Sequence, residues 1–414
     1  MSAGASARKR VLFLSHRLPY PPDKGDKIRS FFELETLARS CDVDLFSFYD
    51  YAEDASYEAK VKEYCREFYA EPLPWFSSRR NAAMALLAGR PFTLGYFYSK
   101  SMQERVQAAL RANRYDLAFV FCSSMAQYVE GCGLPRVMDM VDVDSDKWLQ
   151  YAERVAPPRS WLWSVEGRRL SEYEVRIARE FDATLLCTEP EAEVLRRKAG
   201  AANIRVLGNR VDESYWNPQG VEIPAAVGKL APYVIFTGSM DYMPNVDAAE
   251  WFTRECMPGL KKAITGVKFV VAGRNPTKAV QALAADPAVI ITGSVADMRP
   301  YLSAASVAVA PLRVARGIQN KVLEAMAMGL PVVATTKVAA ALPEKLRARV
   351  AVEDTGEGMA RQIAAMIGGG RADREGIRRD LLRCFGQAEV ERELMNLLSE
   401  TAEKNVPKVE AVSY

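Results

Sequence analysis

The chain has 414 residues, more than one ordinary domain holds, so we expect two domains. Hydrophobic residues make up 49% and charged residues 26%, a balance that supports large cores and excludes a mainly disordered protein. The chain carries 55 lysines and arginines against 52 aspartates and glutamates, and this net charge of +3 lacks the basic excess of a nucleic-acid-binding protein. We therefore expect no nucleic-acid partner.

The cysteines and the N-terminal segment indicate a cytoplasmic location. Seven cysteines are spread along the chain without a CxxC pair, which favours neither a disulfide framework nor a zinc ribbon. The apolar stretch at 11–14 is too short for a signal peptide, and no apolar run reaches the ~20 residues of a membrane span.

Short β-branched or aromatic runs alternate with longer amphipathic stretches, a pattern typical of βαβ units and parallel sheets covered on both faces. The first half predicts strands at 10–15, 43–48, 117–121, 137–141, 184–187 and 204–207. The second half predicts strands at 233–237, 268–272, 289–292, 307–311 and 332–335. The fold class is therefore α/β, with two doubly wound sheets.

A turn-rich segment at 208–230 separates the two sets of strands, so we place the domain boundary there. Helical patterns follow the second set at 356–368, 373–385 and 388–404. The expected division is an N-terminal domain at 8–210, a second domain at 211–385, a final helix at 386–404 and a flexible tail at 405–414.

The loop after the first predicted strand is proline-rich and contains His16 and Gly25. Ligands of doubly wound sheets bind at the carboxyl ends of strands, and Gly25 can bring a helix N-terminus close to an anion. An ordinary βα loop is the alternative, because neither GxGxxG nor GxxxxGK[ST] occurs. His16 is the only histidine, which excludes a multi-histidine zinc site. It can act as a general acid or base, contact a substrate, or be a surface histidine.

Carboxylates gather between a predicted strand and the next predicted helix. Asp142, Asp144 and Asp146 imitate the spacing of EF-hand ligands, but Lys147 stands where that loop requires glycine, so we expect no metal. Asp144 or Ser145 is expected to cap the helix. Asp142 and Asp144 are otherwise candidates for a base or for hydroxyl-binding carboxylates.

The segment 311–334 predicts a buried strand, a glycine-containing loop, a helix and another strand. Lys321 and Glu324 lie one turn apart on that helix. A helix N-terminus with a nearby lysine suits a diphosphate, and a carboxylate one turn later suits ribose hydroxyls. An exposed Lys–Glu pair is the alternative.

These residues carry a resemblance. The run from Glu324 to Ala334 resembles the nucleotide-binding signature of the family 4 glycosyltransferases, retaining enzymes with two Rossmann-like domains in the GT-B fold. The stretches at 209–212, 236–240 with 244–245, 271–274 and 291–295 agree with that family in order and spacing. The runs at 15–29, 142–148 and 317–321 are similar to the sugar transferases associated with exosortase/PEP-CTERM exopolysaccharide systems. The likeness covers residues 10–400.

The resemblance implies that a sugar passes from a nucleoside diphosphate sugar, UDP- or GDP-linked, to a glycan or polyprenyl-linked acceptor, with retention and without a required cofactor. Glu324 would hold the donor ribose, and Lys321 would neutralise the diphosphate. The donor-binding candidates are Gly25, Gly238, Ser239, Arg274, Gly293, Val295, Arg316, Gly317, Asn320, Lys321 and Glu324. The catalytic candidates are His16, Asp142, Asp144 and Lys321.

Three departures from the family pattern keep two other functions open. Arg316 replaces a glutamate and could bind a phosphate or an acidic sugar. The histidine of the acceptor half is absent, and the aspartates at 142 and 144 occupy its strand end. Arg210 replaces the glycine at the domain junction, which argues against a positive φ at this position. The alternatives are a catalytically silent nucleotide-sugar-binding scaffold and a GT-B-like sugar-nucleotide epimerase.

A membrane contact is a further open point. The segment 75–92 flanks an apolar helical stretch with arginines, which suits anionic headgroups. Trp161 and Trp163 pose the same question. Helices packed on the first domain are the alternative to peripheral contact with the cytoplasmic face of the inner membrane.

Overall fold

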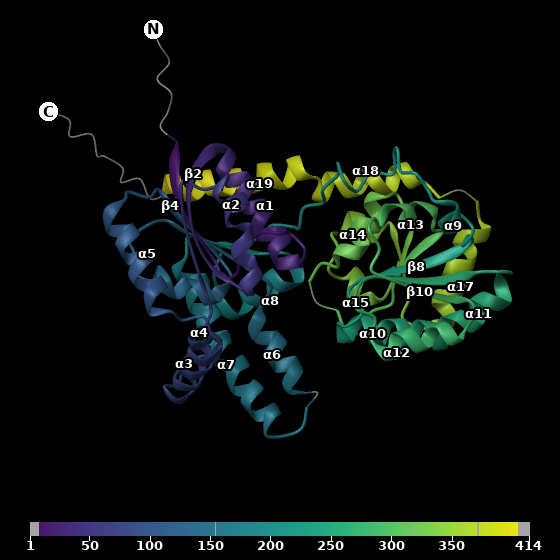
Figure 1. Cartoon of the computed structure of the whole chain (residues 1–414), viewed down its shortest axis with the longest axis horizontal. Coiled ribbons are helices and arrows are strands. Elements are labelled where there is room, and N and C mark those ends of the chain that lie inside the picture. Colours follow the sequence, from purple (N-terminus) through teal and green to yellow (C-terminus); the bar gives the residue numbers. More distant parts are fainter. Residues whose placement is uncertain (1–7, 154, 316, 371, 405–414) are drawn as a thin grey trace, which may run out of the picture. The chain divides into compact units, whose positions relative to one another are not determined.

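The computed structural model describes residues 8–153, 155–315, 317–370 and 372–404 (Figure 1). The chain divides into two compact units. The first contains the residues up to Leu207 and those from Glu391 onward, and the second is Gly208–Val390.

The first unit is built on a seven-stranded parallel sheet in the order β3-β2-β1-β4-β5-β6-β7. The strands are β1 (Lys9–Ser15), β2 (Cys41–Tyr49), β3 (Glu67–Pro72), β4 (Leu117–Phe121), β5 (Arg136–Val141), β6 (Ala183–Leu186) and β7 (Ile204–Val206). The longer helices are α1 (Gly25–Ser40), α3 (Trp75–Leu87), α5 (Lys100–Ala112), α6 (Asp144–Ala152), α7 (Arg159–Glu180) and α8 (Glu189–Ala199). The helix α19 (Gln387–Lys404) begins in the second unit and belongs to the first from Glu391 onward. The shorter ones are η1 (Ala52–Tyr57), α2 (Glu58–Lys62), α4 (Phe92–Tyr96) and η2 (Ser123–Tyr128).

The second unit repeats this topology with six parallel strands in the order β10-β9-β8-β11-β12-β13. They are β8 (Tyr233–Thr237), β9 (Lys268–Ala272), β10 (Val289–Gly293), β11 (Val307–Ala310), β12 (Val332–Ala334) and β13 (Val350–Val352). The helices are α9 (Ala225–Gly228), α10 (Met243–Trp251), η3 (Phe252–Cys256), α11 (Met257–Ala263), α12 (Lys278–Ala282), η4 (Leu283–Ala285), α13 (Arg299–Ala304), α14 (Asn320–Ala327), α15 (Thr336–Ala339), α16 (Glu344–Arg347), α17 (Gly356–Gly368) and α18 (Arg374–Phe385).

The predicted pair of doubly wound parallel sheets is confirmed. Central strands such as β4 and β8 are buried along their whole length, and their continuous apolar sequences are typical of sheets covered on both faces. The sequence missed β3 and β13, which are the last strands at one edge of each sheet. β3 is only partly buried and its sequence has no apolar run, so its pattern is weak.

In both sheets the strand order reverses beside the first strand, between β1 and β4 and between β8 and β11. Loops diverge at such a point and leave a crevice at the carboxyl ends of the strands. The sites described below lie at these two edges. Within the described part of the chain, no helix is long and apolar enough to cross a membrane.

Candidate functional site

In the second unit, the loops that follow β8, β9 and β10 form one backbone surface. The Gly238 amide donates to Ala272 O at 3.1 Å, and the Gly273 amide donates to Gly293 O at 3.1 Å. The amide of Met240 donates to Arg274 O at 2.8 Å. These bonds hold the three loops side by side at the carboxyl edge of the sheet.

Two glycines permit this close approach. Gly238 and Gly273 have φ angles of 155° and 152°, which L side chains rarely adopt. A Cβ on Gly273 would lie 1.7 Å from Gly238 O, and one on Gly238 would lie 2.7 Å from Asn245 Nδ2 and 3.1 Å from Lys321 Nζ. The loop surface beside Lys321 therefore consists of bare backbone, as a phosphate-binding surface requires.

Lys321 is the second residue of α14 and has a fixed position. Its ammonium donates to Asn245 Oδ1 at 2.6 Å and lies 4.3 Å from the centre of the Phe236 ring. Asn245 in turn donates to Ser239 O at 2.8 Å, so one amide joins the lysine to the β8 loop. Burial lowers the pKa of Lys321 to about 7, against the opposing effect of the Glu324 charge.

Glu324 lies one turn further along α14 and is half-buried. Burial raises its pKa to about 7, while the Lys321 charge acts in the opposite direction. Its carboxylate accepts no hydrogen bond from any described residue. Because Lys321 pairs with Asn245 and both charged side chains are partly buried, the alternative of an exposed Lys–Glu pair is wrong.

The other donor-binding candidates of the second unit surround this pair. Arg274 Nε donates to Ser239 Oγ at 3.4 Å, and that hydroxyl donates to Asp241 at 2.6 Å. Asn320, the first residue of α14, accepts from Asn209 at 3.1 Å. The remaining candidates form a set of loop residues: Gly293 and Gly317 have φ angles of 66° and 58°, Val295 is partly buried, and Arg316 lies outside the described residues.

In the first unit, His16 follows β1 and is enclosed by aromatic rings. It stacks on Phe121 at 5.8 Å and meets Phe97 edge-on at 5.6 Å. Its Nε2 lies 3.6 Å from Asp26 Oδ2, just beyond hydrogen-bond length, and its buried Nδ1 has no partner among the described residues. Asp26 also accepts from Arg17 at 2.6 Å. Burial alone would raise the pKa of Asp26, but the neighbouring His16 and Arg17 side chains hold it well below its usual range.

Gly25, the remaining donor-binding candidate, is exposed and opens α1 directly before Asp26. The loop in front of it is fixed by an ion pair of 3.1 Å between Lys24 and Asp50. The helix therefore starts from an ordered loop.

Asp142 and Asp144 lie where β5 ends and α6 begins. Asp142 Oδ1 accepts from the Cys187 thiol at 3.0 Å. The expected N-cap is wrong, because neither Asp144 nor Ser145 caps α6 from within the helix. Two glutamates from other helices do so: Glu191 accepts from the Val143 amide at 2.9 Å, and Glu174 accepts from the Ser145 amide at 3.1 Å.

The carboxyl edge of the first sheet also carries two unusual backbone conformations. Cys122, directly after β4, has a φ of 77°, and Val141, the last residue of β5, has a φ of 65°. This region is costly for a β-branched residue, and such strain concentrates at functional sites. Burial, with a contribution from Asp144, raises the pKa of the Cys122 thiol to about 12, so the thiol stays protonated.

Arg210 departs from the family glycine without backbone strain. The described non-glycine residues with positive φ are Cys122, Val141 and Asn275, so Arg210 has an ordinary conformation. Its guanidinium donates to Gln387 Oε1 at 2.7 Å, and the next amide, that of Val211, donates to Phe385 O at 2.8 Å. The arginine therefore joins residues near the beginning and the end of the second unit.

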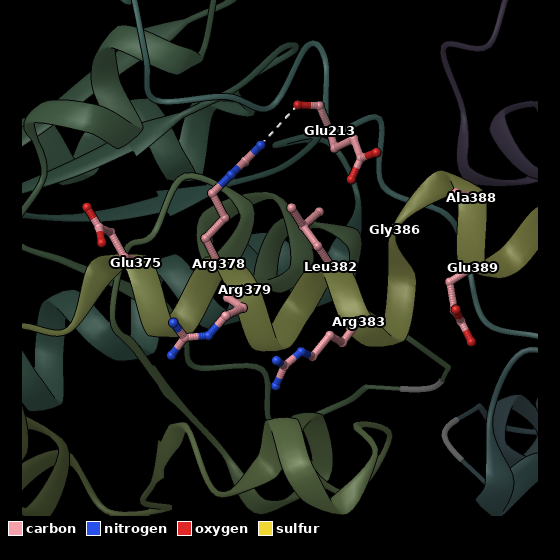
Figure 2. A pocket seen from close by; sticks show the side chains of 9 residues that line it. All are labelled: Glu213, Glu375, Arg378, Arg379, Leu382, Arg383, Gly386, Ala388 and Glu389. Atoms are coloured by element: carbon pink, nitrogen blue, oxygen red, sulfur yellow. Dashed lines mark hydrogen bonds between the residues drawn. The ribbon is translucent and has the colours of Figure 1, made fainter.

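A separate cavity of about 550 Å³ lies along α18 and the first turn of α19, and Figure 2 shows its lining. It contains none of the sequence candidates. Its central arginine, Arg378, points inward and donates to the backbone oxygens of Trp216, Ala327 and Glu213. Arg378 therefore has a structural role, because it joins α18 to the segment 213–216 and to the end of α14.

Sequence reasoning missed the residues that position the candidates. Asn245 holds Lys321, and Asp26 lies beside His16, yet neither was a candidate. Both occur in stretches that carry the resemblance. Their position as polar residues in the first turn of a predicted helix, directly after a predicted strand and its loop, is the signal that could have identified them. Across the described ranges, no three His, Cys, Asp or Glu side chains are grouped so as to hold a metal ion.

Comparisons with known proteins agree with this architecture. Residues 231–368 match the family model described as Glycosyl transferases group 1. A sequence search of curated proteins finds no match. The chain is similar to the crystal structure of HepE from Anabaena in complex with UDP, with a TM-score of 0.67 and 14% identity over 94% of this chain and 100% of that one.

Two further solved structures share the fold. Sucrose-phosphate synthase from Thermosynechococcus elongatus aligns with a TM-score of 0.62 and 15% identity over 96% of this chain and 100% of that chain. A glycosyltransferase from Rickettsia africae aligns with a TM-score of 0.64 and 12% identity over 97% and 100% of the two chains. These likenesses confirm the GT-B fold and, with the family match, support a glycosyltransferase of the GT-B type.

Proposed function

We propose that this protein is a retaining glycosyltransferase of family 4 that takes its sugar from a nucleoside diphosphate sugar. The observation that carries the proposal is the α14 N-terminus, where the Lys321 ammonium is fixed at 2.6 Å from Asn245 beside the backbone surface of the β8 and β9 loops. A diphosphate is the ligand that this combination of a cation, backbone amides and a helix N-terminus suits best.

Glu324 supplies the second donor contact. Its half-buried carboxylate has no hydrogen-bond donor among the described residues, so both oxygens can accept hydrogen bonds from a ligand. The two hydroxyls of a ribose would donate such bonds, one helical turn from the diphosphate. Ser239 and Arg274 lie beside Lys321 and would contact the phosphates, and Gly293 with Val295 would lie near the base.

The chemistry we infer is stabilisation of the leaving group. The bond between the anomeric carbon and the diphosphate oxygen breaks while a bond to an acceptor hydroxyl forms. Negative charge grows on the departing diphosphate, and Lys321 with the fixed backbone dipoles would spread that charge and lower the barrier.

We place the acceptor contacts in the first unit, at the edge that carries His16, Asp142 and Asp144. Support comes from the strained Val141 beside Asp142 and from the buried His16 next to Asp26. One of these groups would receive the proton of the acceptor hydroxyl. We further propose a glycan or polyprenyl-linked acceptor, an exosortase/PEP-CTERM exopolysaccharide pathway and a cytoplasmic location, on the strength of the sequence resemblance.

UDP is the first nucleotide to test. HepE crystals contain UDP in one structure and UDP-glucose in another, and the fold shared with HepE motivates the same nucleotide here. A GDP-linked sugar is the competing donor.

Thermal-shift measurements test the donor site, because a ligand that binds only the folded state raises the Tm. We expect UDP or GDP and the matching sugar nucleotide to raise the Tm of the wild type. Lys321→Ala and Glu324→Gln should each reduce the shift. No shift with any nucleoside diphosphate would contradict the proposal.

Product analysis then separates the enzyme from its alternatives. A transferase consumes the sugar nucleotide only when an acceptor is present. Binding without turnover against any acceptor would instead indicate a scaffold, and conversion of the free sugar nucleotide without acceptor would indicate an epimerase.

A further inference from the structure

Helix α3 exposes four of its five large apolar side chains to solvent, and the two residues that it buries are small. Ser78 and Ala85 are buried on its inner side. A Cβ on Gly95 of α4 would lie 2.4 Å from Asn81 O and 2.7 Å from the Cβ of Ala85, so the two helices pack closely through small residues. A surface helix of a soluble protein normally has the opposite arrangement, with its large apolar residues turned toward the core.

The outward side of α3 is correspondingly apolar. Phe76 and Leu87 are each 82% exposed, Met84 is 60% exposed and Trp75 is 54% exposed. With about 3.6 residues per turn, Phe76 and Leu87 fall on one line opposite Ser78 and Ala85. We call this side, together with Arg79 and Arg80, the α3 outer face.

The charged residues in the sequence segment around α3 are all basic. Between Glu71 and Glu104 the sequence contains four basic residues and no acidic one, although the whole chain has 52 acidic residues. Arg79 and Arg80 are exposed on the helix, and the Arg79 guanidinium lies 3.9 Å from the centre of the Trp75 ring. The basic residues of this segment are Arg79, Arg80, Arg90 and Lys100.

The α3–α4 pair is firmly attached to the first unit. Glu166 of α7 accepts hydrogen bonds from the Phe92 and Thr93 amides at 2.6 and 2.9 Å. Arg169 of α7 donates to Leu86 O at 2.8 Å. Figure 1 shows α3 next to α4 and α7 at one end of the first unit, away from its sheet. Because these bonds fix the orientation of α3, its outer face stays exposed in the folded unit.

We propose that the α3 outer face docks on an anionic lipid surface. The helix lies in the plane of the interface, with Phe76 and Leu87 among the acyl chains and Arg79 and Arg80 among the headgroups. Large apolar side chains flanked by arginines are typical of interfacial helices. A second copy of the chain fits poorly, because a two-fold contact would bring the same positive charges together without an acidic partner in this segment.

The docking goes beyond donor binding, and its bearing on a lipid-linked acceptor rests on the proposed function. A polyprenyl-linked acceptor resides in a membrane, so a docked first unit would work where its acceptor is. Trp161, 65% exposed on the first turn of α7, offers a second aromatic side chain on the helix that holds α3 and α4.

Vesicle flotation tests the proposal with the full-length protein. We expect the wild type to float with vesicles of phosphatidylcholine containing roughly a third phosphatidylglycerol, and to float less with pure phosphatidylcholine. The double variants Phe76→Ser/Leu87→Ser and Arg79→Glu/Arg80→Glu should each bind the anionic vesicles at least about tenfold more weakly. Failure of the wild type to float, or undiminished binding of the serine variant, would overturn the proposal.

Matched controls separate this surface from general effects of charge and apolarity. Lys345→Glu/Arg347→Glu changes the net charge equally on an exposed helix of the second unit, and Ile223→Ser removes an exposed apolar side chain there. Both should float as the wild type does. A different outcome is that the wild type does not bind vesicles but forms a concentration-dependent dimer in sedimentation, and that the serine variant stays monomeric. The α3 outer face would then be a self-association surface, and the proposal would be wrong.

The docking and the proposed function fail independently. Lys321→Ala should float as the wild type does, and the Phe76→Ser/Leu87→Ser variant should keep the wild-type Tm and nucleotide-induced thermal shift. A lowered Tm together with loss of the thermal shift in the Phe76→Ser/Leu87→Ser variant would point to a folding defect. The single variant Phe76→Ser, which is expected to fold because 82% of the side chain is exposed, then takes its place in the flotation test.

Discussion

The ammonium of Lys321 lies 2.6 Å from the side-chain oxygen of Asn245, a residue 76 positions earlier in the chain. Asn245 is buried and also donates to the Ser239 carbonyl. One amide therefore sets both the position of the cation and the course of the β8 loop. The proposed donor site would therefore depend on a residue that need not touch the donor.

Replacing Asn245 by alanine should weaken diphosphate binding although Lys321 remains. A typical hydrogen bond contributes about 0.5–1.5 kcal/mol, so we expect the Kd for the nucleoside diphosphate to rise roughly 3- to 10-fold. Isothermal titration calorimetry measures the change. Glu250→Ala, on the same helix but outside these hydrogen bonds, should bind as the wild type does. An unchanged Kd for Asn245→Ala would mean that the amide does not position the lysine.

Donor binding should take up a proton at pH 8. The pKa of Lys321 is about 7, so the amine is largely neutral at pH 8 in the free protein. A bound diphosphate favours the charged amine and raises its pKa, so roughly one proton is taken up on binding. Calorimetry in buffers of different ionisation enthalpy counts that proton. Lys321→Arg stays charged at this pH and should bind without uptake. Equal uptake in both proteins would exclude Lys321 as the group that titrates.

The sheets were predictable because the apolar pattern of a central strand is visible in a short stretch of sequence. Central strands covered on both faces need continuous apolar runs, and β4, β8 and β9 were predicted residue for residue. The edge strand β3 was missed because its sequence has no apolar run, and β13 was missed because it is only three residues long. Lys321 and Glu324 were recognisable because a helix start places them together within four residues.

Contacts between side chains and distant backbone groups were not predictable, because they join parts of the chain that lie far apart in the sequence. The glutamates that cap α6, Glu174 and Glu191, lie 29 and 48 residues from the amides they accept from. The local sequence pattern therefore predicted Asp144 or Ser145 as the cap of α6, whereas in the structure glutamates from two other helices cap it. The inverted packing of α3 was hidden for a similar reason: its small residues face inward only because Gly95 of α4 lets the backbones approach.

Gly273→Ala should destabilise the second unit and disturb the donor loops. The new Cβ would lie 1.7 Å from Gly238 O, in a backbone conformation that alanine adopts only under strain. We expect a loss of at least about 2 kcal/mol in the free energy of unfolding. Denaturant unfolding measures it. Gly368→Ala, at a helix end with no atom within 4 Å of the new methyl group, is the matched control and should be neutral or slightly stabilising. Comparable losses in both variants would contradict the packing argument.

The buried Glu174 should make stability fall as the pH rises from about 5 to 8. Burial raises its pKa to about 8, against the hydrogen bonds from Ser145 and with a contribution from Asp144. Since the folded pKa exceeds that of the unfolded chain, the folded protein holds more protons in this range, and raising the pH favours unfolding.

Glu174→Gln removes the ionisation and keeps an oxygen that can accept from Ser145. We expect this variant to gain on the wild type by on the order of a few kcal/mol between pH 5 and 8, read from Tm and denaturant midpoints across the range. Glu172→Gln, two residues away on the exposed side of α7, should follow the wild-type profile. A wild type and a Glu174→Gln variant with parallel pH profiles would show that Glu174 titrates alike in the folded and unfolded states.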